Sequence, residues 1–381
     1  MKTVHIVGNR PQFVKLSLLY RAWERRGGAK PIIIHTGQHF SDSMSNVFFR
    51  EFQIPAPDYQ LNINSYPHAE MVGRMLVALD GVLAGERPDG VIVYGDTNTT
   101  LAGALAARKR DIRLAHVEAG IRTGKEDMPE ESNRYLTDRL AELNFSCTYV
   151  GVENLLREGF TAGDVGPVSG AGDSSGVGAG KRGAIASLVY NTGDLMLDAA
   201  LLFKDRAREQ SSLLRQLGLK GKPFILATIH RTENLDHPEA LREILQALVV
   251  LHQDMPVVFP LHPRTKRLID QYGIAADIHT IDPVGYLDMM ALVQACQHVI
   301  TDSGGLSREA YFFRKPSVIV MERPFWPEIL QHGPCLQANA DRLDIVEKFR
   351  ALGSNLLPFQ PELFGDGHAA EKMADILLSI W

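Results

Sequence analysis

The chain has 381 residues, of which 45% are hydrophobic and 22% charged, as is typical of globular proteins, and its length predicts two or three domains. A net charge of -5 argues against nucleic acid as a partner, and three cysteines without metal-ligand spacing argue against a disulfide framework. No run approaches the roughly 18 apolar residues of a membrane span, so we expect a cytoplasmic protein with no membrane partner.

The first half of the chain alternates short apolar runs with patterns typical of helices. This alternation predicts a doubly wound parallel sheet, an α/β fold. Residues 55–67 are expected to be irregular. The predicted strands cover residues 3–7, 31–35, 90–94, 113–117 and 143–147.

The first predicted strand ends in Gly8-Asn9-Arg10-Pro11, and a helix follows. A glycine turn between a strand and a helix can receive phosphate, because the unpaired N–H groups and the helix dipole favour an anion. Arg10 and Lys15 would add positive charge there. A glycine turn is also an ordinary way to leave a strand, so the pattern alone leaves both interpretations open.

Two carboxylates directly follow predicted strands. Asp96 follows the third strand, and Glu118 follows the fourth at the start of a long polar loop. Ligands of open α/β sheets bind outside the carboxyl ends of the strands, which favours a working role for both. The alternative for Asp96 is to cap the next helix, a task equally open to Asn98 or Thr99. The alternative for the loop is a solvated charged surface.

Residues 161–183 differ in composition from the rest of the chain. They are dominated by Gly, Ser and Ala, with almost no large apolar residue. Such a segment cannot bury enough surface to offset its ordering entropy, so we predict a mobile surface insertion.

A second β-α series follows the insertion. His230 and His262 each lie just after a predicted strand, and Ser303-Gly304-Gly305 opens a helix after another. The latter is a second candidate for a phosphate cradle, with Glu309 one to two turns into the helix. Two domains with facing strand ends would form a cleft, a usual ligand site.

Nine motifs in order resemble the non-hydrolysing UDP-N-acetylglucosamine 2-epimerase family. The RPQF and TGQHFSDSMSNVFF variants resemble a branch that includes UDP-2,3-diacetamido-2,3-dideoxyglucuronic acid 2-epimerases. The motifs are GNRPQFVK (8–15), TGQH (36–39), YGDTNTT (94–100), HVEAGIRT (116–123), MPEESNRYLTDRLAE (128–142), TGD (192–194), IHRTEN (229–234), PLHPRT (260–265) and TDSGGLSRE (301–309).

The resemblance implies a glycosyltransferase-B-like fold, with two Rossmann-like domains facing a central cleft. We expect an N-terminal domain over residues 1–190 and a UDP-binding domain over residues 191–365. The helix of residues 366–381 would return to the first domain. Members of the family are commonly dimers, so a homodimer is expected.

The implied activity is inversion at C2 of a UDP-linked 2-acetamido sugar, without metal or nicotinamide cofactor. UDP leaves as the C2 proton is lost, giving a 2-acetamidoglycal, and UDP then re-adds with a proton delivered to the opposite face. The substrate would be UDP-N-acetylglucosamine or its 2,3-diacetamido uronic acid relative. Such a reaction needs a positioned base and a second group that protonates the other face.

The resemblance also assigns residues to these tasks. The implied catalytic residues are Asp96, Glu118, Glu130 and His230, without assignment of which carboxylate takes which proton. The implied substrate-binding residues are Arg10, Lys15, Arg134, Ser303, Gly304, Gly305 and Glu309, of which Glu309 would accept the ribose hydroxyls. Two further residues are interpreted as structural: His116 as a core histidine and Glu131 as a helix N-terminal charge.

The chain departs from the family pattern at Pro324-Phe325, where many members carry a Thr-Glu pair. That change puts contacts of the family at this point in doubt. Three other functions stay open: a hydrolysing epimerase that releases the free sugar, a glycosyltransferase on the same fold, and a UDP-sugar binder without catalysis.

Overall fold

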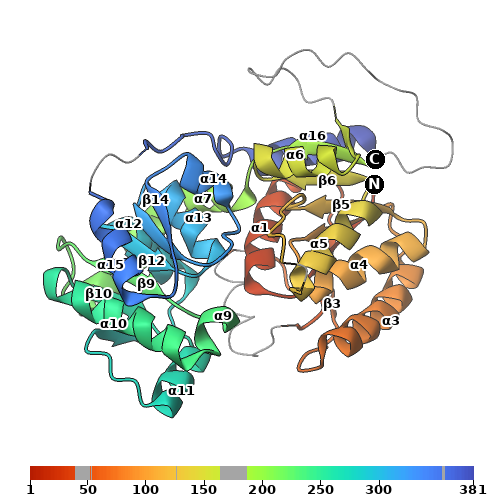
Figure 1. Ribbon diagram of the computed structural model, residues 1–381. Coiled ribbons are helices and arrows are strands. Elements are labelled where there is room, and N and C mark those ends of the chain that lie inside the picture. Colours follow the sequence, from red (N-terminus) through yellow and green to blue (C-terminus); the bar gives the residue numbers. More distant parts are fainter. Residues whose placement is uncertain (39–51, 53, 126, 164–186, 354–356) are drawn as a thin grey trace. The chain divides into compact units, whose positions relative to one another are not determined.

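The computed structural model describes residues 1–38, 52, 54–125, 127–163, 187–353 and 357–381. The chain divides into two compact units, each with its own sheet (Figure 1). Unit 1 comprises residues 1–199 and 364–381, and unit 2 comprises residues 200–363. Within the described residues, no helix combines the length and apolar character needed to cross a membrane.

The described strands of unit 1 form one parallel sheet in the order β3-β2-β1-β4-β5-β6-β8-β7. The chain order therefore reverses at β1, next to β4. The strands are β1 (Thr3–Val7), β2 (Ile32–His35), β3 (Tyr59–Gln60), β4 (Gly90–Tyr94), β5 (Arg113–Val117), β6 (Leu143–Ser146), β7 (Thr161–Ala162) and β8 (Leu188–Asn191).

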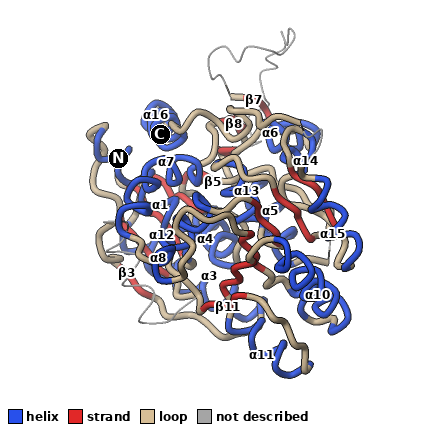
Figure 2. The backbone as a smooth tube through the Cα atoms, turned by 90° about the vertical axis from the view of Figure 1, so that its left-hand side faces the viewer, coloured by secondary structure: helices blue, strands red, loops and turns tan. Residues whose placement is uncertain are grey.

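Helices alternate with these strands along the chain (Figure 1, Figure 2). The helices that begin in unit 1 are α1 (Arg10–Arg25), α3 (His68–Glu86), α4 (Asn98–Lys109), α5 (Pro129–Leu140), α6 (Tyr149–Arg157), α7 (Leu195–Gln210) and α16 (Ala369–Ile380). The chain passes from unit 1 into unit 2 within α7.

Unit 2 repeats the architecture with a parallel sheet in the order β11-β10-β9-β12-β13-β14. Its strands are β9 (Ile225–Thr228), β10 (Val257–Pro260), β11 (His279–Ile281), β12 (His298–Thr301), β13 (Ser317–Val320) and β14 (Cys335–Ala338). Its helices are α8 (Leu213–Gln216), α9 (Thr232–Leu235), α10 (Pro238–Asp254), α11 (Pro263–Tyr272), α12 (Tyr286–Ala295), α13 (Gly304–Phe312), α14 (Pro327–Gln331) and α15 (Arg342–Ala351).

The predicted α/β class with two parallel sheets is confirmed. Every residue of β1, β4, β9 and β13 is buried, as expected for strands covered on both faces. Apolar runs of this kind made the strands recognisable in the sequence.

Two short edge strands contradict the sequence-based expectations. The segment 55–67, expected to be irregular, contains β3, which pairs with β2. The predicted mobile insertion begins with β7, which pairs with β8 through Thr161 and Ala162. Strands of two residues carry no periodic pattern, so only sheet pairing reveals them. Residues 164–183 of the predicted insertion lie outside the described residues.

The C-terminal helix α16 packs against α1 in unit 1. Ion pairs join Arg25 to Glu371 and Arg26 to Asp375. The carboxylate of Asp198, on α7, accepts the backbone N–H groups of Ala369 and Ala370. These are orphan donors of the first turn of α16, so Asp198 fixes the start of that helix.

The burial of Asp198, which outweighs the effect of these hydrogen bonds on its pKa, predicts a pH-dependent contribution to stability. Burial raises the pKa of Asp198 from 3.8 to about 6. The Asp198 carboxyl therefore holds its proton more tightly in the folded protein than in the unfolded chain. The stability that this bound proton contributes is lost as the pH rises through the folded-state pKa of about 6. Replacing Asp198 by Asn removes the titration. We expect the stability difference between wild type and Asp198→Asn to shift by about 2 kcal/mol between pH 4.5 and 7.5.

Urea unfolding followed by tryptophan fluorescence at several pH values measures this shift. The exposed carboxylate of Asp254 provides the control, because Asp254→Asn should show the pH dependence of the wild type. A constant difference between wild type and Asp198→Asn at all pH values would contradict the prediction.

Candidate active site

The parallel strands of unit 1 bring several predicted site residues to one edge of the sheet. β4 lies between β1 and β5, and the carboxyl ends of all three strands point the same way. Lys15 comes from the helix after β1, Asp96 follows β4, and Glu118 follows β5. This is the edge at which open α/β sheets bind their ligands.

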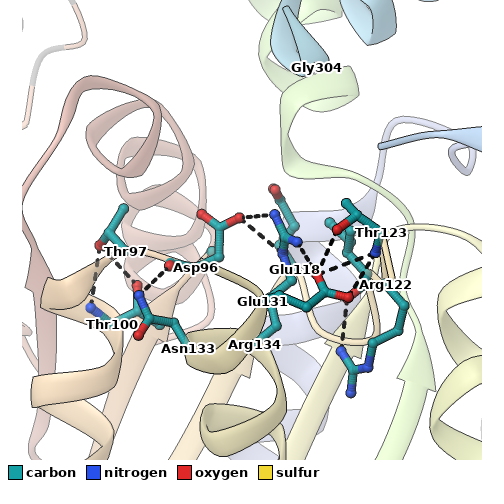
Figure 3. Close-up of polar contacts among 12 residues, drawn as sticks. Asp96, Thr97, Thr100, Glu118, Arg122, Thr123, Glu131, Asn133, Arg134 and Gly304 are labelled. Atoms are coloured by element: carbon teal, nitrogen blue, oxygen red, sulfur yellow. Dashed lines mark hydrogen bonds and ion pairs between the residues drawn. The ribbon is translucent and has the colours of Figure 1, made fainter. Parts of the chain in front are cut away.

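Asp96 is bonded to a buried guanidinium. Arg134 projects from α5, and its Nε donates to the Asp96 carboxylate at 3.0 Å (Figure 3). The Arg134 side chain is 2% exposed, whereas that of Asp96 is 30% exposed. The carboxylate is thus held on one side and open on another, which suits a group that exchanges a proton with a ligand.

Glu131 holds the other side of the same guanidinium. Its carboxylate bonds Arg134 and also accepts the N–H of Thr123 at 2.9 Å (Figure 3). The N–H of Gly124 donates to the same carboxylate at 2.9 Å. The Thr123 hydroxyl donates to it at 3.0 Å. The interpretation of Glu131 as a helix N-terminal charge was therefore incomplete, because this side chain is buried and binds the polar loop to α5.

Glu118 adopts an unusual backbone conformation. Its φ is +75°, in the left-handed region that a side chain rarely adopts. The N–H groups of Glu118 and Ala119 both donate to the carbonyl of Phe145, at 3.0 and 2.9 Å, which holds the strained turn in place. The Glu118 carboxylate bonds the ammonium of Lys15, which is 3% exposed.

The sheet edge also brings Cys147 and Asp194 to Glu118. One ligand atom from each of the three residues lies within 4.8 Å of the others, a grouping that could hold a metal ion. The Lys15 ammonium already bonds the Glu118 carboxylate. A second cation would be repelled by that ammonium, so the arrangement favours Lys15 as the counter-ion of this cluster.

Thr97 caps α4, which leaves Asp96 for another role. The Thr97 side chain accepts the N–H of Thr100, whereas the capping alternatives considered from the sequence were Asp96, Asn98 and Thr99. Gln12 donates to Thr97 and to the carbonyl of Tyr94 at 2.6 Å, and so ties α1 to the end of β4. The turn that carries Asp96 is thereby fixed from both flanks.

The other predicted residues of unit 1 occupy less enclosed positions. Arg10 begins α1 and is half-buried, and Glu130 lies half-buried in the first turn of α5. Their predicted roles, together with diphosphate contacts of Lys15 and Arg134, stay predictions. What the structure adds is that both of those buried cations bond carboxylates.

In unit 2, Asp302 organises the predicted phosphate-binding segments. Its buried carboxylate accepts the N–H groups of His230 and Arg231, at 3.0 and 2.9 Å, and the side-chain amide of Asn234 at 3.0 Å. The imidazole of His230 is 43% exposed and therefore accessible. Because β9 and β12 are neighbours, His230 and the Ser303 turn lie at the same end of this sheet.

Ser303 caps α13 by accepting the N–H of Leu306. Gly304 and Gly305 follow, and a side chain at Gly304 would meet the ring of Phe325 at 2.7 Å. The indole of Trp326 donates to the carbonyl of Gly304 at 2.8 Å. Phe325, which departs from the family pattern, therefore packs against the turn itself, and a side chain at Gly304 would require its ring to shift.

A cationic group completes the surroundings of this turn. The guanidinium of Arg231 lies over the Phe325 ring, 4.8 Å from its centroid. Burial, His230 and Arg264 together lower the pKa of His262. Glu309 lies half-buried in α13. Together, the start of α13, the guanidinium of Arg231 and the exposed imidazole of His230 suit the binding of an anion.

Comparison with known proteins places the chain in a family. The family model described as UDP-N-acetylglucosamine 2-epimerase matches residues 21–378. The chain belongs to this family. A relative from Pseudomonas aeruginosa, named UDP-2,3-diacetamido-2,3-dideoxy-D-glucuronate 2-epimerase, is 41% identical over 100% of both chains. The UDP-N-acetylglucosamine 2-epimerase of Methanocaldococcus jannaschii is 33% identical over 99% of both.

Solved structures of the family share the fold. The Methanocaldococcus jannaschii UDP-GlcNAc 2-epimerase in complex with UDP-GlcNAc and UDP has a TM-score of 0.85, with 33% identity and full coverage of both chains. The Neisseria meningitidis UDP-GlcNAc 2-epimerase bound to UDP-GlcNAc has a TM-score of 0.84, with 25% identity and full coverage. Both align along the whole chain, so this family member contains both units of the fold.

The sequence-based interpretation of this UDP-N-acetylglucosamine 2-epimerase family member missed two organising carboxylates. Glu131 was interpreted as a helix N-terminal charge, and Asp302, which directly precedes the Ser303 turn, was assigned no role. Each of these carboxylates lies at the end of a helix or strand and accepts backbone N–H groups from a different segment of the chain. The sequence does not show which segments supply these N–H groups, so the role of both carboxylates is apparent only in the structure.

The loop after Glu118 depends on a glycine. Gly120 has a φ of +83°, and a Cβ there would lie 2.2 Å from the carbonyl oxygen of Gly151. We expect Gly120→Ala to lower the free energy of unfolding by at least about 3 kcal/mol, because backbone strain adds to a clash that no side chain can relieve. Thermal or urea unfolding measures this loss.

Gly159 provides a matched control. Its φ is +87°, but a Cβ there would meet nothing within 4 Å. Gly159→Ala should therefore cost only about 1 to 2 kcal/mol, the penalty of the left-handed conformation alone. Equal losses in the two variants would contradict the proposed clash.

Proposed function

We propose that this chain inverts the configuration at C2 of a UDP-linked 2-acetamido sugar without releasing the free sugar. The observation that carries the proposal is the pair Asp96 and Glu118, each bonded to its own buried cation, Arg134 and Lys15. Two carboxylates at neighbouring strand ends, in different surroundings, suit opposite proton transfers. Membership of the family supports the same reaction.

The proposed reaction balances as an elimination followed by an addition. A base removes the C2 proton, the C1–O bond to UDP breaks, and a C1–C2 double bond forms. UDP oxygen then attacks C1 while an acid returns a proton to the other face of C2. Asp96 and Glu118, with Glu130 as the third candidate carboxylate, would exchange these protons.

The diphosphate needs stabilisation as its charge develops. In unit 2, the N-terminus of α13 with Ser303, Gly304 and Gly305 offers backbone N–H groups for it. His230, 43% exposed, is available as a donor to the leaving group. Glu309, from the same helix, is proposed to accept the ribose hydroxyls.

The 2,3-diacetamido uronic acid sugar is the first candidate substrate. The Pseudomonas aeruginosa relative named for that sugar is 41% identical, whereas relatives named UDP-N-acetylglucosamine 2-epimerase are 34% identical in Methanococcus maripaludis and 31% in Escherichia coli. UDP-N-acetylglucosamine is the second candidate. A homodimer and a cytoplasmic location stay predictions from the sequence.

Proton NMR in deuterated water tests the function. Each UDP-sugar is incubated with the protein, and we expect deuterium at C2 together with a new UDP-sugar of manno configuration. The faster substrate is the proposed one. Free sugar plus UDP as the main products would instead identify a hydrolysing enzyme. Absence of exchange with both sugars would contradict the proposal.

Removing either carboxylate charge should abolish most of the activity. We expect Asp96→Asn and Glu118→Gln each to lower kcat by about 100- to 10,000-fold, the usual contribution of a positioned acid or base. Affinity for UDP, measured by calorimetry, should change little, because the proposed diphosphate groups of unit 2 are untouched. Asp127→Asn, an exposed carboxylate of the same loop, should retain activity. A variant that loses only UDP affinity would show that its carboxylate binds rather than transfers protons.

A further inference from the structure

A fully buried histidine stands behind the candidate catalytic turns. His116 lies on β5, two residues before Glu118, and is 0% exposed. Its Nε2 is 2.7 Å from the carbonyl oxygen of Gly95, and its Nδ1 is 2.7 Å from the carboxylate of Asp138. A carbonyl can only accept, so Nε2 donates its hydrogen to Gly95.

The hydrogen bond to Gly95 fixes the turn that carries Asp96. Gly95 has a φ of +64°, and its own N–H donates to the carbonyl of Val117 at 2.8 Å. The next carbonyl, that of Asp96, accepts the side-chain amide of Asn133 at 2.9 Å. Both carbonyls that flank the Asp96 N–Cα unit are therefore held by side chains from other elements.

The Asp138 carboxylate connects the same histidine to the Glu118 loop. Its Oδ2 accepts the N–H of Gly120 at 3.3 Å and bonds the guanidinium of Arg122 at 2.8 Å. Arg122 in turn grips Glu158 with two hydrogen bonds, of 2.7 and 2.9 Å. The contacts of Asp138 thus reach a residue two positions beyond Glu118.

We propose that His116 is a positioning residue that, through Asp138 and Arg122, sets the separation of Asp96 and Glu118. This inference rests on the proposed function, because a fixed separation matters only if both carboxylates serve one reacting carbon. His116 itself contacts no substrate in this proposal. It links the Gly95 turn to the Gly120 turn, and each turn carries one carboxylate.

The chemistry of the network favours this role over simple core filling. Burying an imidazole and a carboxylate is costly unless every polar atom is paired. Apolar side chains would fill the same volume more cheaply. They could hold neither the Gly95 carbonyl, as His116 does from β5, nor the Gly120 N–H, as Asp138 does from α5. Three residues in these turns have positive φ (Gly95, Glu118 and Gly120), so the backbone needs such restraints.

Two amide substitutions separate positioning from folding. The amide nitrogen of Gln can reach the place of Nε2 and keep the bond to Gly95, whereas the shorter Asn can only approach the place of Nδ1. We expect His116→Asn to lower kcat by about 100-fold, because a displacement near 1 Å costs a reaction about that much. His116→Gln should recover at least about tenfold of this loss, and KM should change less than about threefold in both variants.

The control is another fully buried histidine of the same sheet. His5, on β1, bonds the hydroxyl of Tyr94 rather than a backbone group of either turn. His5→Asn should lower stability while leaving kcat of the folded protein near that of the wild type. A fall in kcat as large as that of His116→Asn would show that any buried polar substitution disturbs the reaction, and would overturn the proposal.

Hydrogen exchange measured by mass spectrometry provides a readout that does not require activity. In His116→Asn, peptides covering residues 94–97 and 118–122 should exchange faster, whereas those of α4 should not. Unchanged exchange in both turns would overturn the positioning role. A different outcome would refute the proposed function alone. In it, the backbone amides of both turns exchange faster in His116→Asn, but the wild-type protein introduces no deuterium at C2 of either sugar. If the histidine variants do not fold, kcat and backbone hydrogen exchange are measured instead in Arg122→Lys, which alters the end of the network.

Discussion

The organisation of unit 1 depends on one buried guanidinium. Arg134 is almost inaccessible to solvent, and a charge in that position is tolerated only when acceptors surround it. Asp96 and Glu131 supply those acceptors from opposite sides (Figure 3). Since Glu131 also binds Thr123 and Gly124, the same interaction joins the end of β4, the polar loop and α5.

The second carboxylate obeys the same constraint with a different partner. Glu118 bonds Lys15, an ammonium on the first helix, and its backbone is held in a left-handed conformation by the carbonyl of Phe145. A planar guanidinium offers fixed, directional donors, whereas an ammonium is a compact and mobile point charge. Two carboxylates with such different cations need not behave alike, which is the property that epimerisation requires of its acid and its base.

In unit 2, a buried carboxylate again positions the candidate site residues. Asp302 is buried, and it accepts N–H groups from His230 and Arg231, which follow the neighbouring strand β9. These hydrogen bonds fix the backbone that carries the exposed imidazole of His230, next to the start of α13. Phe325 packs on Gly304 and under Arg231, so the departure from the family pattern shapes the surroundings of the turn without removing its N–H groups.

The sequence by itself determined the fold class, because apolar runs such as Gly90–Tyr94 and the glycine turns after them are local features. It also identified Asp96, Glu118 and the Ser303 turn as candidates, since position after a buried strand can be read along the chain. It could not assign partners: Lys15 and Glu118 are 103 positions apart, and Arg134 and Asp96 are 38 apart. Only the parallel sheet, which brings successive strand ends to one edge, decided that these charges meet. It also decided that Glu131 bonds Arg134, and that His116 and Asp138 bond backbone groups of the turns at Gly95 and Gly120.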